Sequence, residues 1–271
     1  MRGPRSLYEF EDNWITDLGA CFPGEGRAVL RGRDLLRDFP DTPWMALLLF
    51  AITGREFTAN QVKLFEGIWT ICASYPDPRL WNNRVAALAG TARSTAALAM
   101  GAATAVSEAS IYGRRPDIRA IDLLYRINAQ LDRGINLEEL IDAEMRKHRL
   151  IPGYGRPLRQ KDERIAPLMD LARGLGCAGG TYVKLAFEIE NTLLEGRWRF
   201  SMNIAALCAA LAADQGLSIR QFYYYSLFSF TIGMLMCHID SSAKPEGTLF
   251  PIRCDRLHYQ GSGQRQWEEG A

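Results

Sequence analysis

The residues of this 271-residue chain whose types and spacing are best suited to binding chemistry lie in the stretch IPGYGRPLRQKDERI, residues 151–165. Two glycines flank Tyr154 and would let the backbone approach a ligand closely. Four basic residues follow: Arg156, Arg159, Lys161 and Arg164. Such side chains bind phosphate through charge-assisted hydrogen bonds. The pattern therefore predicts a phosphate site, with a solvated turn that carries Arg and Lys as the alternative.

The overall charge of the chain excludes one class of function. The formal net charge is +1, so a general nucleic-acid binder, which carries a basic excess, is not expected. Hydrophobic residues make up 48% of the chain, enough to bury a sizeable core. A small local basic site remains compatible with this balance.

The cysteines and histidines point away from disulfides and metals. Six cysteines are scattered without a CxxC pair, and only three histidines are present. We therefore expect reduced thiols, a cytoplasmic location and no metal site. The N-terminal residues show no apolar signal region, so export is not expected.

The elements that must position the basic loop are expected to be helices. Apolar periodicity and capping residues predict helices over 43–53, 58–75, 83–110, 118–130, 137–149, 162–175, 182–195, 202–215 and 221–238. Thr58 and Ser218 are the expected N-caps. Only the stretch RAVLR, residues 27–31, has a strand-like pattern. The fold class is therefore predicted to be all-α.

The segment 221–238 carries no fixed charge and is the one candidate for a membrane span. It is shorter than the roughly 20 apolar residues a span needs, and it contains three tyrosines. A buried helix is therefore the favoured interpretation, and a membrane helix is the alternative. Breaks near 113–116 and 215–218 predict two domains.

Several segments together resemble one family. The basic loop resembles the P-G-F-G-H-x-x-(Y)-K-x-x-D-P-R signature of citrate synthases and citryl-CoA lyases. Four other segments resemble parts of the same family in the same order: AVLRGRDLLRD (28–38), VKLAFEIENTLLEGRWRFSMNIAALCAAL (183–211), TIGMLMCHIDSS (231–242) and LFPIRCDRLHYQG (249–261). The resemblance covers most of the chain and is weakest before residue 25 and across 76–84.

The resemblance implies a citrate synthase-like fold with two helical domains and a homodimer. It implies a large domain, residues 1–112 plus 216–271, and a small coenzyme A-binding domain, residues 113–215. Coenzyme A, as an acyl-CoA substrate, would bind at six residues: Gly153, Tyr154, Gly155, Arg159, Lys161 and Arg164. The dimer would pack through 83–110. No nucleic-acid or membrane partner is expected.

The sequence departs from the family at the residues that would do the chemistry. The family uses a histidine and an aspartate to form an enol and a second histidine to donate to a carbonyl. Tyr112, Arg156 and Ala205 stand at these positions. Tyr and Arg have unperturbed pKa values of roughly 10 and above 12, so neither suits a general base near neutral pH. Ordinary citrate chemistry is therefore not expected.

The replacements still offer hydrogen-bond donors. Tyr112 and Arg156 could stabilise an oxyanion or hold a carboxylate. Asn203 and His238 complete the candidate catalytic set, although His238 equally fits a satisfied core histidine. The family places carboxylate-binding arginine in the C-terminal segment, so Arg253 and Arg256, together with Arg84, are candidates to bind a substrate carboxylate; a solvated surface is the alternative.

Two functions remain open at this point. One is a divergent enzyme that binds an acyl-CoA and makes or breaks a carbon–carbon bond in a non-standard way. The alternative is a non-catalytic homologue that binds a thioester or carboxylate, or acts as a dimeric interaction partner.

Overall fold

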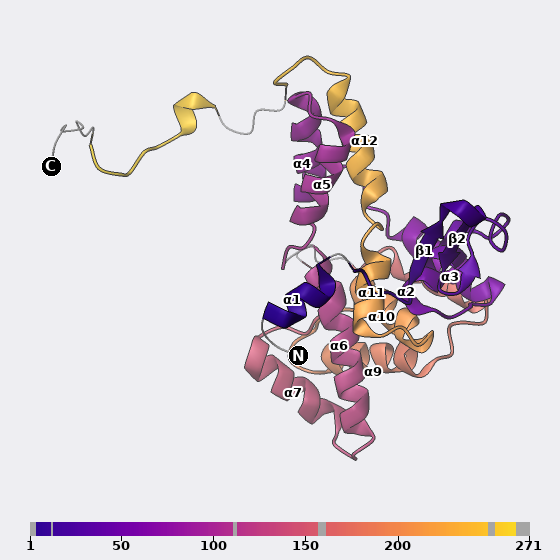
Figure 1. Cartoon of the computed structure of the whole chain (residues 1–271). Helices are drawn as coiled ribbons and strands as arrows, with labels where there is room; N and C mark the ends of the chain where they lie inside the picture. The colour runs from indigo at the N-terminus through magenta and orange to yellow at the C-terminus, as the bar shows by residue number, and fades with distance from the viewer. Residues whose placement is uncertain (1–3, 12, 111–112, 157–160, 249–252, 264–271) are drawn as a thin grey trace. The chain divides into compact units, whose positions relative to one another are not determined.

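The structure, a computed structural model, describes residues 4–11, 13–110, 113–156, 161–248 and 253–263 (Figure 1). Contacts within the chain divide it into two compact units, and each is described by itself. Unit 1 comprises Met1–Ala73 and Ser107–Phe230, and unit 2 comprises Ser74–Val106 and Thr231–Ala271. The described residues are mostly helical, which confirms the all-α class.

Unit 1 holds most of the helices and a small antiparallel sheet. Its helices are α1 (Pro4–Phe10), α2 (Trp44–Thr53), α3 (Ala59–Ile71), α6 (Arg114–Leu131), α7 (Leu137–His148), α8 (Ile165–Gly174), α9 (Thr181–Glu195), α10 (Ile204–Asp214) and α11 (Ile219–Ser226). The sheet has the order β1 (Gly19–Phe22), β2 (Arg27–Leu30), β3 (Arg33–Asp34), with the short 3₁₀ turn η1 (Pro23–Glu25) between β1 and β2. The strand expected near residue 27 is thus present as β2.

Helix α10 lies at the centre of the unit 1 core. Every residue from Ala205 to Ala213 is buried. The sequence AALCAALAA supplies mostly methyl groups, so the neighbouring helices can approach closely. Helices α6 and α9 pack against it. The loop that contains Gly153 and Gly155 reaches this core at the N-terminus of α10.

The predicted N-caps are confirmed. Thr58 begins α3 and Ser218 begins α11, each with a complete capping box. In both boxes the cap hydroxyl accepts a hydrogen bond from the backbone N–H three residues later. The glutamine at that later position accepts, through its side-chain oxygen, a hydrogen bond from the backbone N–H of the cap residue.

Unit 2 is built from three helices and a short turn: α4 (Trp81–Thr91), α5 (Ala96–Val106), α12 (Thr231–Ser242) and η2 (Cys254–Arg256). Helices α4 and α12 are in very close contact. A Cβ atom on Gly90 would lie 2.7 Å from the carbonyl oxygen of His238, so this position requires glycine.

The single helix expected over 83–110 is wrong, because α4 and α5 are separate. The chain reverses at Arg93, a non-glycine residue with φ +59°. Its guanidinium donates to the carbonyl oxygens of Ser242 at 2.6 Å and Lys244 at 2.7 Å. These bonds satisfy carbonyl oxygens at and just after the end of α12.

The long helix expected over 221–238 is also two helices. Helix α11 ends at Ser226 and α12 begins at Thr231. The fully buried guanidinium of Arg114 donates to the carbonyl oxygens of Ser226 and Leu227. Within the described parts of the chain, no helix is long and apolar enough to cross a membrane.

The domain boundaries expected near residues 112 and 216 both fall inside unit 1. The two compact units are therefore grouped differently from the expected large and small domains. The division into a large domain, residues 1–112 plus 216–271, and a small coenzyme A-binding domain, residues 113–215, stays a prediction.

Candidate functional site

The glycine-containing start of the loop is held inside unit 1, whereas Lys161, further along, is exposed. Residues 151–154 are all buried. Gly153 and Gly155 have φ values of +87° and +81°, a region that L side chains rarely adopt. A Cβ on Gly153 would lie 2.6 Å from the Cβ of Ala206, so glycine is needed for space as well as for conformation.

Main-chain bonds fasten this loop to the segment before α10. The N–H of Gly155 donates to the carbonyl of Ser201 at 2.7 Å, and the N–H of Asn203 donates to the carbonyl of Gly153 at 2.9 Å. The hydroxyl of Tyr154 donates to the carbonyl of Ala186 in α9 at 2.7 Å. The loop backbone is therefore held on both sides of Tyr154.

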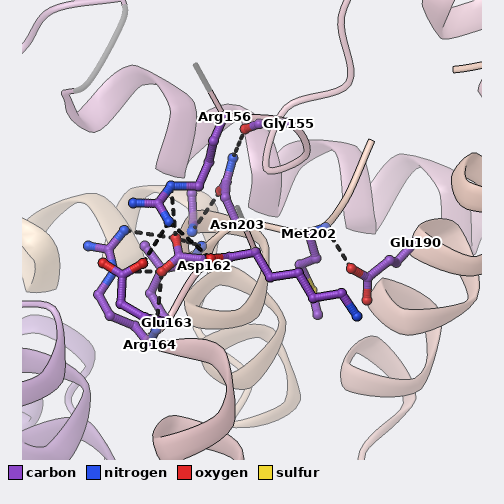
Figure 2. A network of polar contacts seen from close by, with 11 residues as sticks. Gly155, Arg156, Asp162, Glu163, Arg164, Glu190, Met202 and Asn203 are labelled. Carbon is purple, nitrogen blue, oxygen red and sulfur yellow. Dashed lines mark hydrogen bonds and ion pairs between the residues drawn. The ribbon is translucent and has the colours of Figure 1, made fainter. Parts of the chain in front are cut away.

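Asn203 joins the loop to the N-terminus of α10 (Figure 2). Its Oδ1 accepts the N–H of Ala205 at 3.0 Å, as an N-cap does, and its Nδ2 donates to the carbonyl of Gly155 at 2.9 Å. The expected catalytic role of Asn203 is untested. The geometry gives it a positioning role, since both ends of its amide hold backbone.

Asp162 is the second group that holds the N-terminus of α10. Its carboxylate accepts the N–H of Ile204 at 3.0 Å and receives two bonds from Arg164, at 2.9 and 2.8 Å. Burial raises the pKa of Asp162, but the hydrogen bonds and charge of Arg164 and the bound N–H groups outweigh this and lower it. Asp162 is therefore a fixed anion.

Arg156 lies beside this fixed pair. Its guanidinium donates to the carboxylate of Glu163 at 2.7 Å and to the carbonyl of Lys161 at 3.4 Å, and it lies 3.9 Å from Asp162 (Figure 2). The loop thus brings together two of the predicted guanidinium groups, each already facing a carboxylate.

Asp117, in the first turn of α6, is a titratable group that the sequence reasoning missed. The residue as a whole is half-buried, and its carboxyl is the part withdrawn from solvent. Burial raises its pKa from 3.8 to about 7, and the charges of Arg114 and Arg164 oppose the shift only partly. No sequence signal identifies it, because an acidic residue in the first turn of a helix is ordinary.

The remaining predicted residues are distributed as follows. His238 is buried in unit 2, where its Nε2 is bonded to the carbonyl of Ser94 at 3.1 Å, as a satisfied core histidine would be. Arg84 donates to the carbonyl of Pro78, and Arg253 pairs with Asp255. Arg256 is exposed. Tyr112 and Arg159 lie outside the described residues.

Metal-ligating side chains do not gather in the described parts of either unit. No group of three or more His, Cys, Asp or Glu residues there could hold a metal ion. At the loop, the charged groups that gather are Arg156, Asp162, Glu163 and Arg164.

Comparison by sequence gave no relatives: no protein-family model and no curated protein matches the chain. Comparison by structure found proteins with a similar fold. Citryl-CoA lyase from Hydrogenobacter thermophilus aligns with a TM-score of 0.80 and 17% identity, covering 94% of this chain and 97% of that one. The chain has the citrate synthase fold. The resemblance inferred from the five sequence segments is thus confirmed at the level of the fold.

Other proteins of the citrate synthase fold extend the comparison. ATP citrate lyase from Methanosaeta concilii, in complex with (3S)-citryl-CoA, matches 97% of this chain and 45% of its own length, with a TM-score of 0.73 and 15% identity. Citrate synthase from Thermoplasma acidophilum, in complex with carboxymethyl coenzyme A and oxaloacetate, matches 84% of this chain and 60% of its own, with a TM-score of 0.66 and 16% identity.

The steric need for glycine in the loop gives a first prediction. Gly153→Ala should lower the free energy of unfolding by roughly 2–4 kcal/mol, from backbone strain plus overlap with Ala206. The matched control is Gly134→Ala, because Gly134 has φ +83° and nothing near its Cβ direction. Strain alone should cost the control about 1 kcal/mol. If urea unfolding showed that both variants lose the same free energy of unfolding, the close approach of Gly153 to Ala206 would be contradicted.

The raised pKa of Asp117 gives a second prediction, for stability against pH. Between about pH 4 and 7 the folded protein holds a proton on this carboxyl that the unfolded chain has released. Its contribution to stability is thus greatest below pH 3.8 and falls as the pH rises to about 7.

Asp117→Asn should remove that fall. The free energy of unfolding of the variant, relative to the unmutated protein, should rise by at most about 1.4 kcal/mol per pH unit across this window. Chemical unfolding at a series of pH values measures the difference. Asp170→Asn, at an exposed position of α8, is the control and should keep the original slope. A parallel curve for Asp117→Asn would show that this carboxyl ionises normally.

Proposed function

We propose that this protein binds an acyl-CoA and acts on it in a carbon–carbon bond-forming or bond-cleaving reaction that differs from ordinary citrate synthesis. One observation carries the proposal: a glycine-rich loop with basic side chains is fixed against the N-terminus of a buried helix, within a fold shared with proteins whose structures contain citryl-CoA or carboxymethyl coenzyme A. A fixed loop costs little further ordering when a ligand binds.

The loop geometry supports different roles for its basic residues. Arg164 already makes two bonds to a fully buried carboxylate, so we assign it to holding the loop. Lys161 is exposed and donates no side-chain bond to Asp162 or Glu163 among the contacts described. We assign the coenzyme A phosphates to Lys161 and, by the resemblance, to Arg159, with Gly153, Tyr154 and Gly155 forming the adjoining backbone wall.

The proposed reaction relies on hydrogen-bond donors that stabilise negative charge, and not on proton transfer by a histidine and an aspartate. Ala205 is buried and offers no proton-transfer group at the start of α10. Arg156 lies 3.9 Å from Asp162, which holds the N-terminus of α10, and it presents a permanently charged hydrogen-bond donor suited to an oxyanion or a carboxylate. By the resemblance, Tyr112 supplies a second donor. A substrate that is already activated, such as a carboxylated thioester, suits this arrangement because it demands less of a base.

A non-catalytic, ligand-binding role is the second candidate. Pairing of the Arg156 guanidinium with Glu163 favours it, because a catalytic donor engaged by a neighbouring carboxylate must first be released. Turnover of a bound thioester would exclude this candidate, and tight binding without turnover would support it. The cytoplasmic location expected from reduced thiols stays a prediction.

We also propose that the protein is a homodimer. Several residues of α5 and α12 in unit 2 leave an apolar surface exposed: Ala97, Leu98, Gly101, Ala102 and Ala105 on α5, and Ile232, Met236 and Ile239 on α12. Small residues on α5 would let a helix of a second copy come close. The resemblance implies a dimer through the same part of the chain.

Coenzyme A binding tests the first part of the proposal. Isothermal titration should detect a complex with coenzyme A or a short acyl-CoA at micromolar to millimolar concentration. Lys161→Ala should weaken binding about tenfold or more, since a charge-assisted bond is worth about 1.5–3 kcal/mol. Lys147→Ala, on the exposed end of α7, is the control and should change affinity little. No binding by the unmutated protein would refute the proposal.

Citrate chemistry should be negligible in the unmutated protein. Each lost acid–base group costs about 10²–10⁴-fold in rate, and three positions are changed. Coenzyme A release from acetyl-CoA with oxaloacetate, and cleavage of citryl-CoA, are the two assays. A triple variant, Tyr112→His, Arg156→His and Ala205→Asp, is the comparison. Robust citrate formation by the unmutated protein would show that these positions are not the reacting ones.

Light scattering tests the dimer. The unmutated protein should have twice the mass of one chain at micromolar concentration. Leu98→Asp should shift it to the monomer, because a charge would be buried in the apolar contact. Leu36→Asp replaces a similarly exposed leucine of unit 1 and should leave the dimer intact. A monomeric unmutated protein would count against the proposal.

A further inference from the structure

Two carboxylates of different character face the guanidinium of Arg156. Glu163 accepts its hydrogen bond at 2.7 Å, and 58% of the Glu163 side chain is exposed. Asp162 lies 3.9 Å from it, and none of the Asp162 side chain is exposed. One partner is therefore on the solvent side and the other belongs to the interior.

The two carboxylates differ in how many hydrogen bonds would break if each moved away. Asp162 accepts the N–H of Ile204 and two bonds from Arg164, so moving it would break all three bonds at once. Glu163 is exposed while the Arg156 side chain is only 18% exposed, so solvent screens this ion pair more than it screens the bonds of the buried Asp162. An anion from solution can therefore compete with Glu163 but not with Asp162.

The charges in this cluster define what the competitor must be. The side chains of Arg156 and Arg164 carry two positive charges, and those of Asp162 and Glu163 carry two negative charges. When Glu163 leaves Arg156, the cluster around the guanidinium has one unmatched positive charge. A single carboxylate restores neutrality and matches the guanidinium geometry, whereas a phosphate dianion would bring one charge too many.

We propose that Glu163 occupies the place of a ligand carboxylate on Arg156 and thereby sets the preference of the site for thioesters whose acyl group carries one free carboxylate. This inference rests on the proposed acyl-CoA binding. The incoming carboxylate takes the bond that Glu163 gives up, and Asp162 keeps its place near Arg156; Figure 2 shows the two carboxylates and the guanidinium.

Succinyl-CoA and butyryl-CoA are matched probes, because they share a four-carbon acyl chain and differ at its end, carboxylate against methyl. Calorimetric titrations would use the unmutated protein, Glu163→Gln, Arg156→Gln and the double variant. Glu163→Gln should tighten succinyl-CoA binding about three- to tenfold, because an internal competitor is removed, and change butyryl-CoA less than about twofold. Arg156→Gln should abolish the preference for succinyl-CoA, with no further effect of Glu163→Gln.

Glu188→Gln is the control for net charge. It removes one negative charge at an exposed position of α9 and should leave both affinities unchanged. Circular dichroism would check that each variant is folded.

Two results would overturn the inference while acyl-CoA binding stands: succinyl-CoA affinity that is unchanged or weaker in Glu163→Gln, or an equal gain for both thioesters. Binding of neither thioester by any protein, the unmutated one included, would overturn the proposed function and this inference with it.

Discussion

The N-terminus of α10 has to be satisfied inside the protein, because this helix is buried along almost its whole length. Its N-terminal residues Asn203 and Ile204 are half-buried, and side chains accept hydrogen bonds from its first N–H groups. The amide of Asn203 accepts one of them and the carboxylate of Asp162 accepts another. A negative charge at this position also suits the positive end of the helix dipole.

The candidate site follows from that requirement. Asp162 needs a positive partner to remain ionised in the interior, and Arg164 provides it with two bonds. Asn203 must keep its oxygen toward α10, so its nitrogen faces the carbonyl of Gly155 and fixes the glycine-rich loop. Arg156 is then carried to the edge of the cluster. Asp162, Arg164 and Asn203 therefore have structural roles, and Arg156, at the edge of the cluster, is left to contact a ligand.

Local signals in the sequence predicted what depends on local physics. Thr58 and Ser218 were identifiable as caps because the capping box lies within four residues. The loop was identifiable from its glycines and basic residues, and the order of family-like segments indicated the fold. The hydrogen bonds that hold the loop in place could not be predicted, because their acceptors, Ser201 and Ala186, are distant in sequence from the loop residues that donate to them.

The two wrong helices failed for the same physical reason. One break lies at Arg93, whose guanidinium donates to a carbonyl at the end of α12, and the other follows α11, where a carbonyl accepts from the guanidinium of Arg114. In both cases the bonded residues are more than a hundred positions apart in the chain. Helical periodicity continues through both breaks and carries no trace of these partners. The altered pKa of Asp117 was equally unpredictable, since it arises from tertiary burial. For Tyr112 and Arg159, which lie outside the described residues, the sequence expectation stands alone.

The bonds that close unit 1 have a consequence for how the chain acquires its structure. Arg55 donates to the carbonyl of Gly216, 161 residues away, and the hydroxyl of Tyr225 donates to the carbonyl of Phe65, 160 residues away. Contacts of such separation require loop closure before they contribute, so folding is slow compared with that of a local helical bundle. During synthesis α2 and α3 emerge before these partners, so part of their apolar surface stays uncovered until residues 216–225 have been made.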